Sequence, residues 1–380
     1  TNGYGLRTLF SGNLDILKNS IFYTFGGELY KDEYNWQTFE NLYEENDGNG
    51  SLEGDKLSQN KEFRHQFNGF ATASYPFTSQ LTAQLGLNIN KTQYDFRDLF
   101  NLGESNTSAN RNFKALFLPS LDINYTLSPT NQLYANISRG FSNPSIEETL
   151  TPDGIINPDI VQETGTNYEL GIEHESKDNR HKVNIALYVM PIKNLLVAKR
   201  VGDNQYIGRN AGKTKHQGID FDWSYKFNVT DKIEISPFIS YTYSNHKFID
   251  FIDDEANEDY SDNDLTGVPK NKINSGIRTN FGNGLFLNIT HQFVDEIPLT
   301  DANSLYSDSF NLLNFKLGYK NQISEQLRVG LDFGINNITD TKYAQSVLIN
   351  ASGFGGNAPR YFYPGNNINY YGGVKINYTL

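Results

Sequence analysis

Two arginines and a tyrosine gather in a short stretch near the middle of the chain. Arg200 and Arg209 lie near the two ends of this stretch, and Tyr206 lies between them. Guanidinium groups make paired hydrogen bonds to anions, and a phenol ring adds an apolar surface with a polar tip, so the set suits an anionic ligand. Arg360 and Tyr361 form a second candidate of the same kind. The alternative for both sets is packing between strands or between loops.

The remaining reactive residues form no recognisable catalytic or metal-binding constellation. Eight acidic residues lie between Asp250 and Asp264. Their carboxylates are of the type that binds a hard cation or repels anionic material. A solvated acidic loop without a ligand also explains them. No nucleophilic triad, carboxylate pair or phosphate-binding loop occurs, so we expect neither an enzyme nor catalytic residues. The histidines are scattered and lack close spacing to carboxylates, so no metal site is expected: His65, His174, His181, His216, His246 and His291.

Composition limits the class of protein further. The chain has 380 residues, no cysteine and a formal net charge of -12. The lack of cysteine excludes disulfides and thiolate metal sites, and the acidic balance argues against nucleic acid as a partner. Hydrophobic residues make up only 37% of the chain, whereas aromatic residues reach 14%. A wall one residue thick, wet on one side and apolar on the other, has such a composition.

Apolar and polar residues alternate along most of the chain. In the clearest segment every second residue is apolar: Ile219, Phe221, Trp223, Tyr225 and Phe227. About fifteen segments of roughly ten residues show this period, which predicts strands with one face in lipid and the other in water. A long strand is predicted from Val183 to Ala198 and a loop from Gly202 to Lys213. No apolar run approaches the roughly 18 residues of a membrane helix, so a membrane protein here must be a closed barrel.

The connections between these segments alternate strictly between short turns and long loops. Short turns on the periplasmic side and long loops outside are typical of outer-membrane barrels. The whole chain, residues 1–380, is therefore predicted to be one all-β, antiparallel transmembrane β-barrel domain. Its long extracellular loops are expected near residues 40–60, 99–112, 142–165, 200–213, 249–269, 296–310 and 341–367.

Five stretches in order along the chain resemble the barrel of TonB-dependent outer-membrane receptors. The most informative is 138–173, with SRGFSNPSIEE followed by NPDIVQETGTNYELGIE. The others are 210–220, where Asp220 replaces the usual Glu; 268–272, where Asn271 replaces His; 334–343; and 359–373. Each match is weak alone, but their order and spacing fit the family from about residue 110 to the end.

The resemblance implies part of a larger receptor. Bacterial single-chain barrels have even strand numbers, and plugged transporters have about 22 strands. The chain is therefore expected to hold about 15 of about 22 strands. The plug domain and the remaining strands are expected in a preceding segment, since no plug is found in this chain.

The family further implies a receptor in the outer membrane of a Gram-negative bacterium that actively imports a scarce nutrient. The FSNPS loop and the closing motifs resemble most the receptors for ferric siderophores and ferric citrate. Expected partners are thus a ferric chelate or another small nutrient, the plug domain, a periplasmic TonB-type energy transducer and outer-membrane lipid. Neither a cofactor nor nucleic acid is expected. Uptake of cobalamin or an oligosaccharide by the same fold, and a passive porin or a barrel enzyme, are the alternatives.

Overall fold

The computed structural model describes most of the chain. The described residues are 1–16, 19–48, 50–149, 156–202, 205–210, 212–253, 257–351, 353 and 358–379; the side chains of 43, 146–147, 197–202, 205–207 and 253 lie outside this description. The chain divides into two compact units, which are described one at a time. Unit 1 holds 1–123, 137–166 and 192–211, and unit 2 holds 124–136, 167–191 and 212–380.

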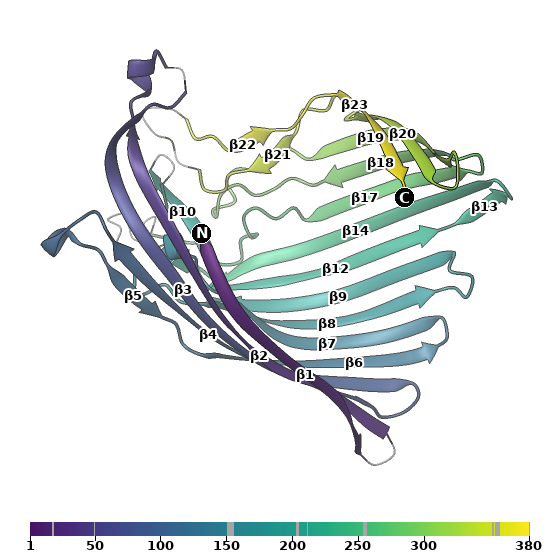
Figure 1. Cartoon of the computed structure of the whole chain (residues 1–380), viewed down its shortest axis with the longest axis horizontal. Coiled ribbons are helices and arrows are strands. Elements are labelled where there is room, and N and C mark those ends of the chain that lie inside the picture. Colours follow the sequence, from purple (N-terminus) through teal and green to yellow (C-terminus); the bar gives the residue numbers. More distant parts are fainter. Residues whose placement is uncertain are drawn as a thin grey trace. The chain divides into compact units, whose positions relative to one another are not determined.

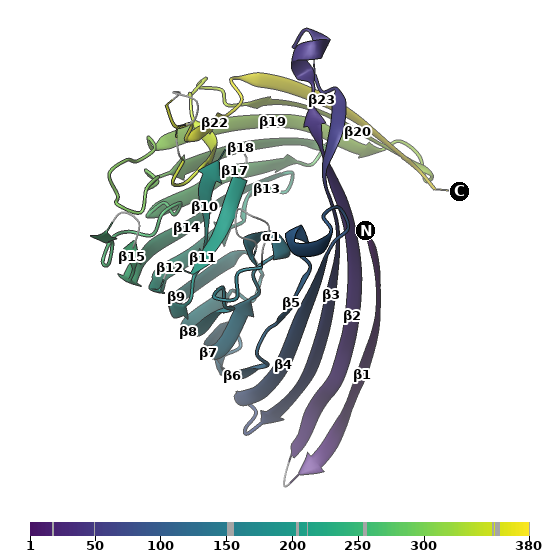
Figure 2. The same cartoon turned by 90° about the vertical axis from the view of Figure 1, so that its left-hand side faces the viewer.

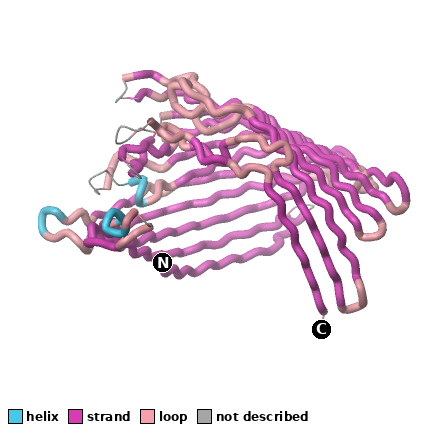
Figure 3. The backbone as a smooth tube through the Cα atoms, turned by 90° about the horizontal axis from the view of Figure 1, so that it is seen from above, coloured by secondary structure: helices cyan, strands magenta, loops and turns pink. Residues whose placement is uncertain are grey.

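Strands dominate the described residues, and helices are confined to single turns (Figure 3). Seventeen of the described strands belong to one large antiparallel sheet. Two of them, β5 (Ala109–Asn112) and β13 (Phe227–Thr230), have four residues each. The other fifteen have ten residues or more, which confirms the predicted strand number. They are β1 (Asn2–Ile16), β2 (Asn19–Asn41), β3 (Glu53–Pro76), β4 (Leu81–Asp98), β6 (Leu116–Ser128), β7 (Asn131–Ser142), β8 (Glu163–Glu175), β9 (His181–Lys193), β12 (Lys213–Tyr225), β14 (Ile233–Asp250), β17 (Asn271–Phe281), β18 (Leu285–Val294), β19 (Phe310–Gln322), β20 (Leu327–Asn336) and β23 (Asn369–Tyr378).

The loop segments carry the remaining elements. Three predicted long loops contain two-stranded sheets of their own. The 142–165 loop contains a one-turn α-helix, and the 40–60 and 99–112 loops each contain a short 3-10 helix. These elements are β10 (Leu196–Gly202) with β11 (Gln205–Asn210), β15 (Ile252–Asp253) with β16 (Glu258–Asp259), β21 (Ala344–Val347) with β22 (Phe362–Pro364), α1 (Ile146–Thr149), η1 (Tyr43–Asn46) and η2 (Gly103–Ser105). None of the described helices is long and apolar enough to cross a membrane.

The strand predicted from Val183 to Ala198 and the loop predicted from Gly202 to Lys213 are wrong in their boundaries. Strand β9 ends at Lys193, and β10 and β11 then form a hairpin within 196–210. Asn194 interrupts the predicted strand because its φ of 58° belongs to the left-handed region, which asparagine tolerates better than most residues. Alternation alone does not reveal such a single-residue break.

In unit 1 the four strands β1 to β4 run side by side (Figure 1). The register joins Leu29 to Leu6 on one side and to Phe67 on the other, so one face of this sheet is apolar. Successive side chains of a strand point to opposite faces. Tyr30 and Gln66 therefore lie on the other, polar face. We call the apolar face the outer face and the polar face the inner face, and use the same terms for unit 2.

Unit 2 repeats this two-faced pattern with shorter strands. Ile219 of β12 lies opposite Tyr243 of β14, and Asp220 lies opposite Thr242, so the predicted apolar and polar faces are confirmed. The predicted hairpin about Asn283 and Gly284 joins β17 to β18. Gly284 has a φ of 92°, a conformation that side-chain-bearing residues rarely adopt.

The inner face of unit 2 contains glycines that are covered by aromatic rings from a neighbouring strand. A β-carbon added to Gly171 of β8 would overlap the ring of Tyr134, which belongs to β7. Gly334 of β20 is covered in the same way by Tyr371 of β23. A glycine at these positions lets a large ring from the neighbouring strand lie flat on the sheet.

Candidate functional site

A polar cavity of about 240 Å³ lies on the inner face of unit 1, in the upper part of β2 to β4 near the long loops. The strand register builds it. Asp32 and Tyr34 of β2 lie opposite Arg64 and Glu62 of β3, and Arg64 lies opposite Tyr94 of β4. We call these five residues, together with Ser145 at the start of α1, the inner-face site. It brings one cation, two carboxylates and two phenols into one cavity.

Arg64 is the cation of the inner-face site. Its Nη2 and Nε atoms donate hydrogen bonds to the two carboxylate oxygens of Asp32, at 2.6 and 3.3 Å. The guanidinium carbon also lies 5.8 Å from the centre of the Tyr30 ring. The Arg64 side chain remains partly exposed, at 44%. The ion pair thus orients the guanidinium and leaves part of it available to a ligand.

Glu62 and Trp36 form the second polar contact beside the cavity. The indole Nε1 of Trp36 donates a hydrogen bond of 2.7 Å to Oε1 of Glu62. Glu62 is buried, at 8% exposure, so this bond satisfies a carboxylate that has little access to water. Tyr30, Tyr34 and Trp36 occupy alternate positions of β2 and therefore share the inner face.

Tyr94 connects the cavity wall to the 142–165 loop. The residue is 3% exposed, and its hydroxyl donates a hydrogen bond of 2.7 Å to the carbonyl oxygen of Pro144. On the outer face at this level β4 carries the charged pair Asp95 and Arg97, so Tyr94 lies beyond the lipid-facing part of the strand. Burial raises the pKa of Tyr94 to about 12. The phenol therefore stays protonated, and able to donate this hydrogen bond, well into the alkaline range.

The loop that carries the SNPSIEE motif is folded against β4. Asn143 donates a hydrogen bond of 2.9 Å from Nδ2 to Oγ1 of Thr92. Ile156, further along the same loop, packs in a buried apolar cluster with Tyr94, Phe96 and Phe113. These contacts hold the loop at the inner-face site rather than away from the sheet. Thus the stretch that most resembles the family is also the stretch that caps this cavity.

A capping box stabilises the N-terminus of helix α1. The Ser145 Oγ accepts a hydrogen bond of 3.1 Å from the Glu148 backbone, and Glu148 Oε2 accepts one of 2.7 Å from the Ser145 backbone. The helix lies beside the β10–β11 hairpin (Figure 2). A β-carbon at Gly208 of β11 would overlap the Glu148 carbonyl, so only glycine permits this approach.

The first predicted ligand set lies on the β10–β11 hairpin of unit 1. Arg200 and Tyr206 are direct cross-strand partners, while Arg209 pairs with Val197. The register therefore brings Arg200 and Tyr206 together, with Arg209 three positions away. The side chains of Arg200 and Tyr206 lie outside the described residues, so this set stays a prediction.

The second predicted set lies in unit 2, between β21 and β22. The Tyr361 carbonyl accepts a hydrogen bond of 2.8 Å from the Leu348 backbone, and its ring centre lies 6.4 Å from that of Phe362. Arg360 is exposed to solvent. These contacts indicate packing within the loop for Tyr361, and the ligand role of both residues stays a prediction.

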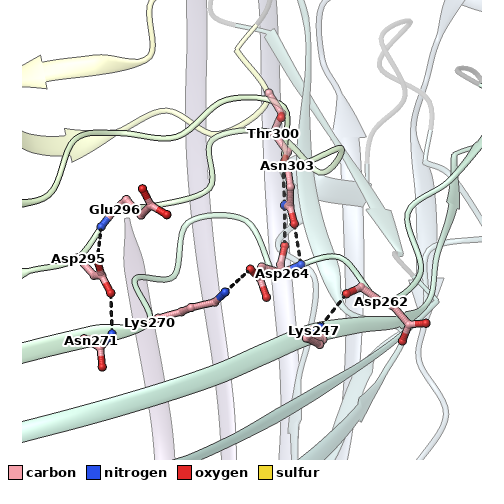
Figure 4. Close-up of polar contacts among 9 residues, drawn as sticks. All are labelled: Lys247, Asp262, Asp264, Lys270, Asn271, Asp295, Glu296, Thr300 and Asn303. Atoms are coloured by element: carbon pink, nitrogen blue, oxygen red, sulfur yellow. Dashed lines mark hydrogen bonds and ion pairs between the residues drawn. The ribbon is translucent and has the colours of Figure 1, made fainter.

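A network of polar contacts joins the loops of unit 2 (Figure 4). Lys270 forms an ion pair of 2.8 Å with Asp264, and the Asn303 amide exchanges hydrogen bonds of 2.7 and 2.9 Å with the Asp264 backbone. The side chains of Asp301 and Asn350 are also bonded, at 3.0 Å. These bonds connect the segments 251–270, 295–309 and 337–368. Asp264, one of the acids predicted to lie in a solvated loop, is thus an internal link.

Two histidines that look unrelated in the sequence are stacked on the inner face of unit 2. The ring centres of His216 and His246 are 4.4 Å apart, and the rings are nearly parallel, at 8°. The register of β12 with β14 places them opposite each other. Sequence spacing gave no sign of this pair, because its members belong to strands separated by a turn. Among the described residues no group of three His, Asp or Glu side chains is placed to hold a metal ion.

The two-faced strands and long loops are typical of an outer-membrane β-barrel. A family profile described as TonB dependent receptor-like, beta-barrel, matches residues 1–338. The chain therefore belongs to the family of TonB-dependent receptor β-barrels.

Solved structures of such receptors share the fold. The siderophore receptor PiuA from Acinetobacter baumannii is 15% identical, with a TM-score of 0.73 over 99% of this chain and 55% of that one. The ferric citrate transporter FecA in the unliganded form is 16% identical, with a TM-score of 0.77 over 98% of this chain and 54% of that one. The copper transporter OprC is 13% identical, with a TM-score of 0.70 over 99% and 56%. The chain thus spans about half the length of these receptors, and the likeness concerns the fold.

Proposed function

We propose that this chain is the barrel portion of an outer-membrane receptor that binds and imports a ferric siderophore or ferric citrate. The observation that carries the proposal is the inner-face site, where an oriented and partly exposed guanidinium lies among phenols under the SNPSIEE loop. Ferric chelates of these kinds are anionic and bear flat or polar oxygen-rich surfaces. An arginine fork suits their carboxylate or phenolate oxygens, and aromatic rings suit their faces.

The transport step extends this proposal. A plug domain and the remaining strands, in a segment preceding this chain, are proposed to complete the receptor. A periplasmic TonB-type transducer is proposed to drive release of the chelate into the periplasm. The ligand-binding roles of Arg200, Tyr206, Arg209, Arg360 and Tyr361 belong to the same proposal, as loop residues that first meet the chelate.

Tryptophan fluorescence offers a direct test. The chain has two tryptophans, and Trp36 belongs to the inner face next to Glu62. In a Trp223→Phe variant, Trp36 is the one tryptophan left in this chain, so the tryptophan fluorescence of the chain reports on the inner-face site. Titration with ferric citrate, a ferric catecholate and a ferric hydroxamate is expected to quench Trp36 with one of them at micromolar concentration or below. The iron-free chelators serve as controls. The absence of saturable quenching by every ferric chelate contradicts the proposal.

An oligosaccharide is the second candidate ligand, because Tyr30, Tyr34 and Trp36 line one face of β2. Aromatic rings on one face of a strand can stack against sugar rings. Isothermal titration with maltodextrin and chitin oligosaccharides distinguishes the two candidates. Saturable binding of a glycan without binding of any ferric chelate favours the oligosaccharide.

A further inference from the structure

Five polar side chains form a head-to-tail chain of hydrogen bonds on the inner face of unit 1. Gln162, directly before β8, donates from Nε2 to Oδ1 of Asn143 at 2.8 Å, and Asn143 donates from Nδ2 to Oγ1 of Thr92 at 2.9 Å. The Thr92 hydroxyl donates to Asn90 at 3.0 Å, and the Asn90 amide donates to Asn68 of β3. Thr92 and Asn90 are fully buried, and Gln162 is 7% exposed. Water cannot replace the partners of such buried groups, so the chain of bonds fastens the loop before β8 to the sheet.

The residues on both sides of Gln162 attach the β10–β11 hairpin. Asn210, the last residue of β11, accepts a hydrogen bond of 2.9 Å from the Val161 backbone and donates one of 3.1 Å to the Val161 carbonyl. Oε2 of Glu163 accepts a hydrogen bond of 2.9 Å from the backbone of Leu196, the first residue of β10. Both ends of the hairpin are thus fastened to the neighbours of the residue that fastens the loop. We call Val161, Gln162 and Glu163 the joint.

The hairpin has two further contacts that restrict its movement. Asn210 donates a second hydrogen bond, of 2.8 Å, to the carbonyl oxygen of Asn194, which closes the base of the hairpin. Away from the joint, β11 approaches α1 so closely that a β-carbon at Gly208 would overlap the carbonyl oxygen of Glu148. Neither the hairpin nor α1 can therefore move far without disturbing the other.

Two of the stretches that resemble the receptor family meet at the joint. The stretch 138–173 supplies Asn143 and the whole joint, and the stretch 210–220 begins with Asn210. The hydrogen-bonding groups of these side chains are directed at one another and at the backbone. This arrangement indicates that they couple the loop to the hairpin rather than contact a ligand.

We propose that the joint makes residues 143–149, which include α1, and the β10–β11 hairpin one cooperative unit that detaches from the sheet as a whole. Local opening of a protein occurs in such units when neighbouring segments share the contacts that must break. The hairpin that carries Arg200 and Tyr206 therefore keeps a fixed relation to Ser145 at the inner-face site. The inference goes beyond the proposed function and holds whichever nutrient the receptor carries.

Hydrogen exchange of the purified protein in detergent, followed by mass spectrometry, tests the cooperative unit. Asn143→Ala and Asn210→Ala are each expected to accelerate exchange about tenfold in both 143–149 and the hairpin, because each removes a bond from one shared opening equilibrium. The double variant is expected to accelerate exchange about 100-fold in both segments, because the two losses multiply. Asn110→Ala is the matched control, since Asn110 is exposed on β5 and its side chain makes no hydrogen bond to the described residues.

Independent segments give a different pattern, in which Asn143→Ala accelerates exchange only in 143–149 and Asn210→Ala only in the hairpin. That pattern, or no acceleration in either segment, overturns the proposal when peptides of β17 and β18 exchange at the wild-type rate and so show a folded protein. A second pair of variants gives the same decision where an alanine at these positions prevents folding. Glu163→Ala is expected to accelerate exchange in both segments, whereas Glu163→Gln keeps an oxygen acceptor for the Leu196 backbone and is expected to exchange as the wild type does. Acceleration confined to the hairpin in Glu163→Ala also overturns the proposal.

Discussion

Arg64 and Asp32 lie directly opposite each other on β3 and β2, and two hydrogen bonds hold the guanidinium against the carboxylate. A second arginine, Arg97, is paired with Asp95 one strand away on the outer face. The two arginines thus provide a matched comparison between the inner-face site and the outer face.

Arg64→Gln is expected to lower the affinity for the ferric chelate at least tenfold. A hydrogen bond to a charged group contributes about 1.5–3 kcal/mol, and the variant also leaves Asp32 as an uncompensated negative charge in the site. Arg97→Gln removes the same charge from the outer face and is expected to bind as the wild type does. Fluorescence titration of Trp36 measures both. Equal losses in the two variants contradict a specific role for Arg64.

Tyr94→Phe is expected to loosen the 142–165 loop while leaving the sheet intact. The variant removes the donor to the buried Pro144 carbonyl, and an unsatisfied buried acceptor costs about 1–3 kcal/mol. Hydrogen exchange within 143–149 is expected to accelerate, and limited proteolysis is expected to cut this loop faster. Tyr34→Phe changes a more exposed phenol of the same site and is the control. Unchanged exchange in Tyr94→Phe counts against the anchoring role.

Asp98 is expected to stabilise the 99–108 segment in a pH-dependent way. Burial alone raises its pKa, but hydrogen bonds from the Asn101 backbone and side chain and from the Phe100 and Thr107 backbones outweigh it and lower the pKa to about 2. The ordinary value is about 3.9. The stabilisation is therefore complete above about pH 4 and is lost as the pH falls towards 2. Asp98→Ala is expected to cost about 1–3 kcal/mol at pH 7. Hydrogen exchange of this segment measures the loss, and Asp95→Ala is the control.

The His216 and His246 pair is expected to make unit 2 sensitive to mild acid. The outer-face neighbours Lys215 and Gln217 are polar, so the pair lies beyond the lipid-facing part of β12. Burial and the neighbouring His246 lower the pKa of His216 to about 4. Between about pH 6.5 and pH 4 the unfolded chain binds a proton that the folded chain does not, so stability falls as the pH is lowered.

Thermal melting followed by circular dichroism at pH 7 and pH 5 tests the histidine pair. His216→Gln is expected to reduce the difference between the two melting temperatures. His291→Gln removes a histidine from another strand pair and is expected to keep the wild-type difference. If both variants keep it, the pair is not the source of the acid sensitivity.

Gly171→Ala is expected to destabilise unit 2 by about 1–3 kcal/mol, because the new methyl group overlaps the Tyr134 ring. The same substitution in a Tyr134→Ala background is expected to cost much less, since the ring is then absent. Gly140→Ala is the control, because a β-carbon there meets no atom within 4 Å. The temperature at which the gel mobility changes on heating measures the stability of the Gly171→Ala, Tyr134→Ala, double and Gly140→Ala variants. Additive effects of the two substitutions contradict the direct contact.

The sequence by itself determined the class of this protein and the two faces of its strands. A period of two needs no knowledge of distant contacts, because each residue's side is set by its neighbours along the strand. Ile219 and Asp220 were thus assigned to opposite faces from the pattern alone. The order of the motifs likewise indicates the family without any knowledge of the tertiary structure. Single-residue interruptions were not visible, so the break at Asn194 and the hairpin after it were missed.

Only the tertiary structure decided which residues meet. Arg64 faces Asp32, His216 stacks on His246, and the SNPSIEE loop reaches Tyr94 because of strand register and loop path. Strand register and loop path both depend on contacts between residues far apart in the chain. A shift of the register by one residue changes the cross-strand partner of every residue in the strand. The inner-face site therefore had no signature in the sequence, although every residue that forms it was already assigned to a strand or a loop.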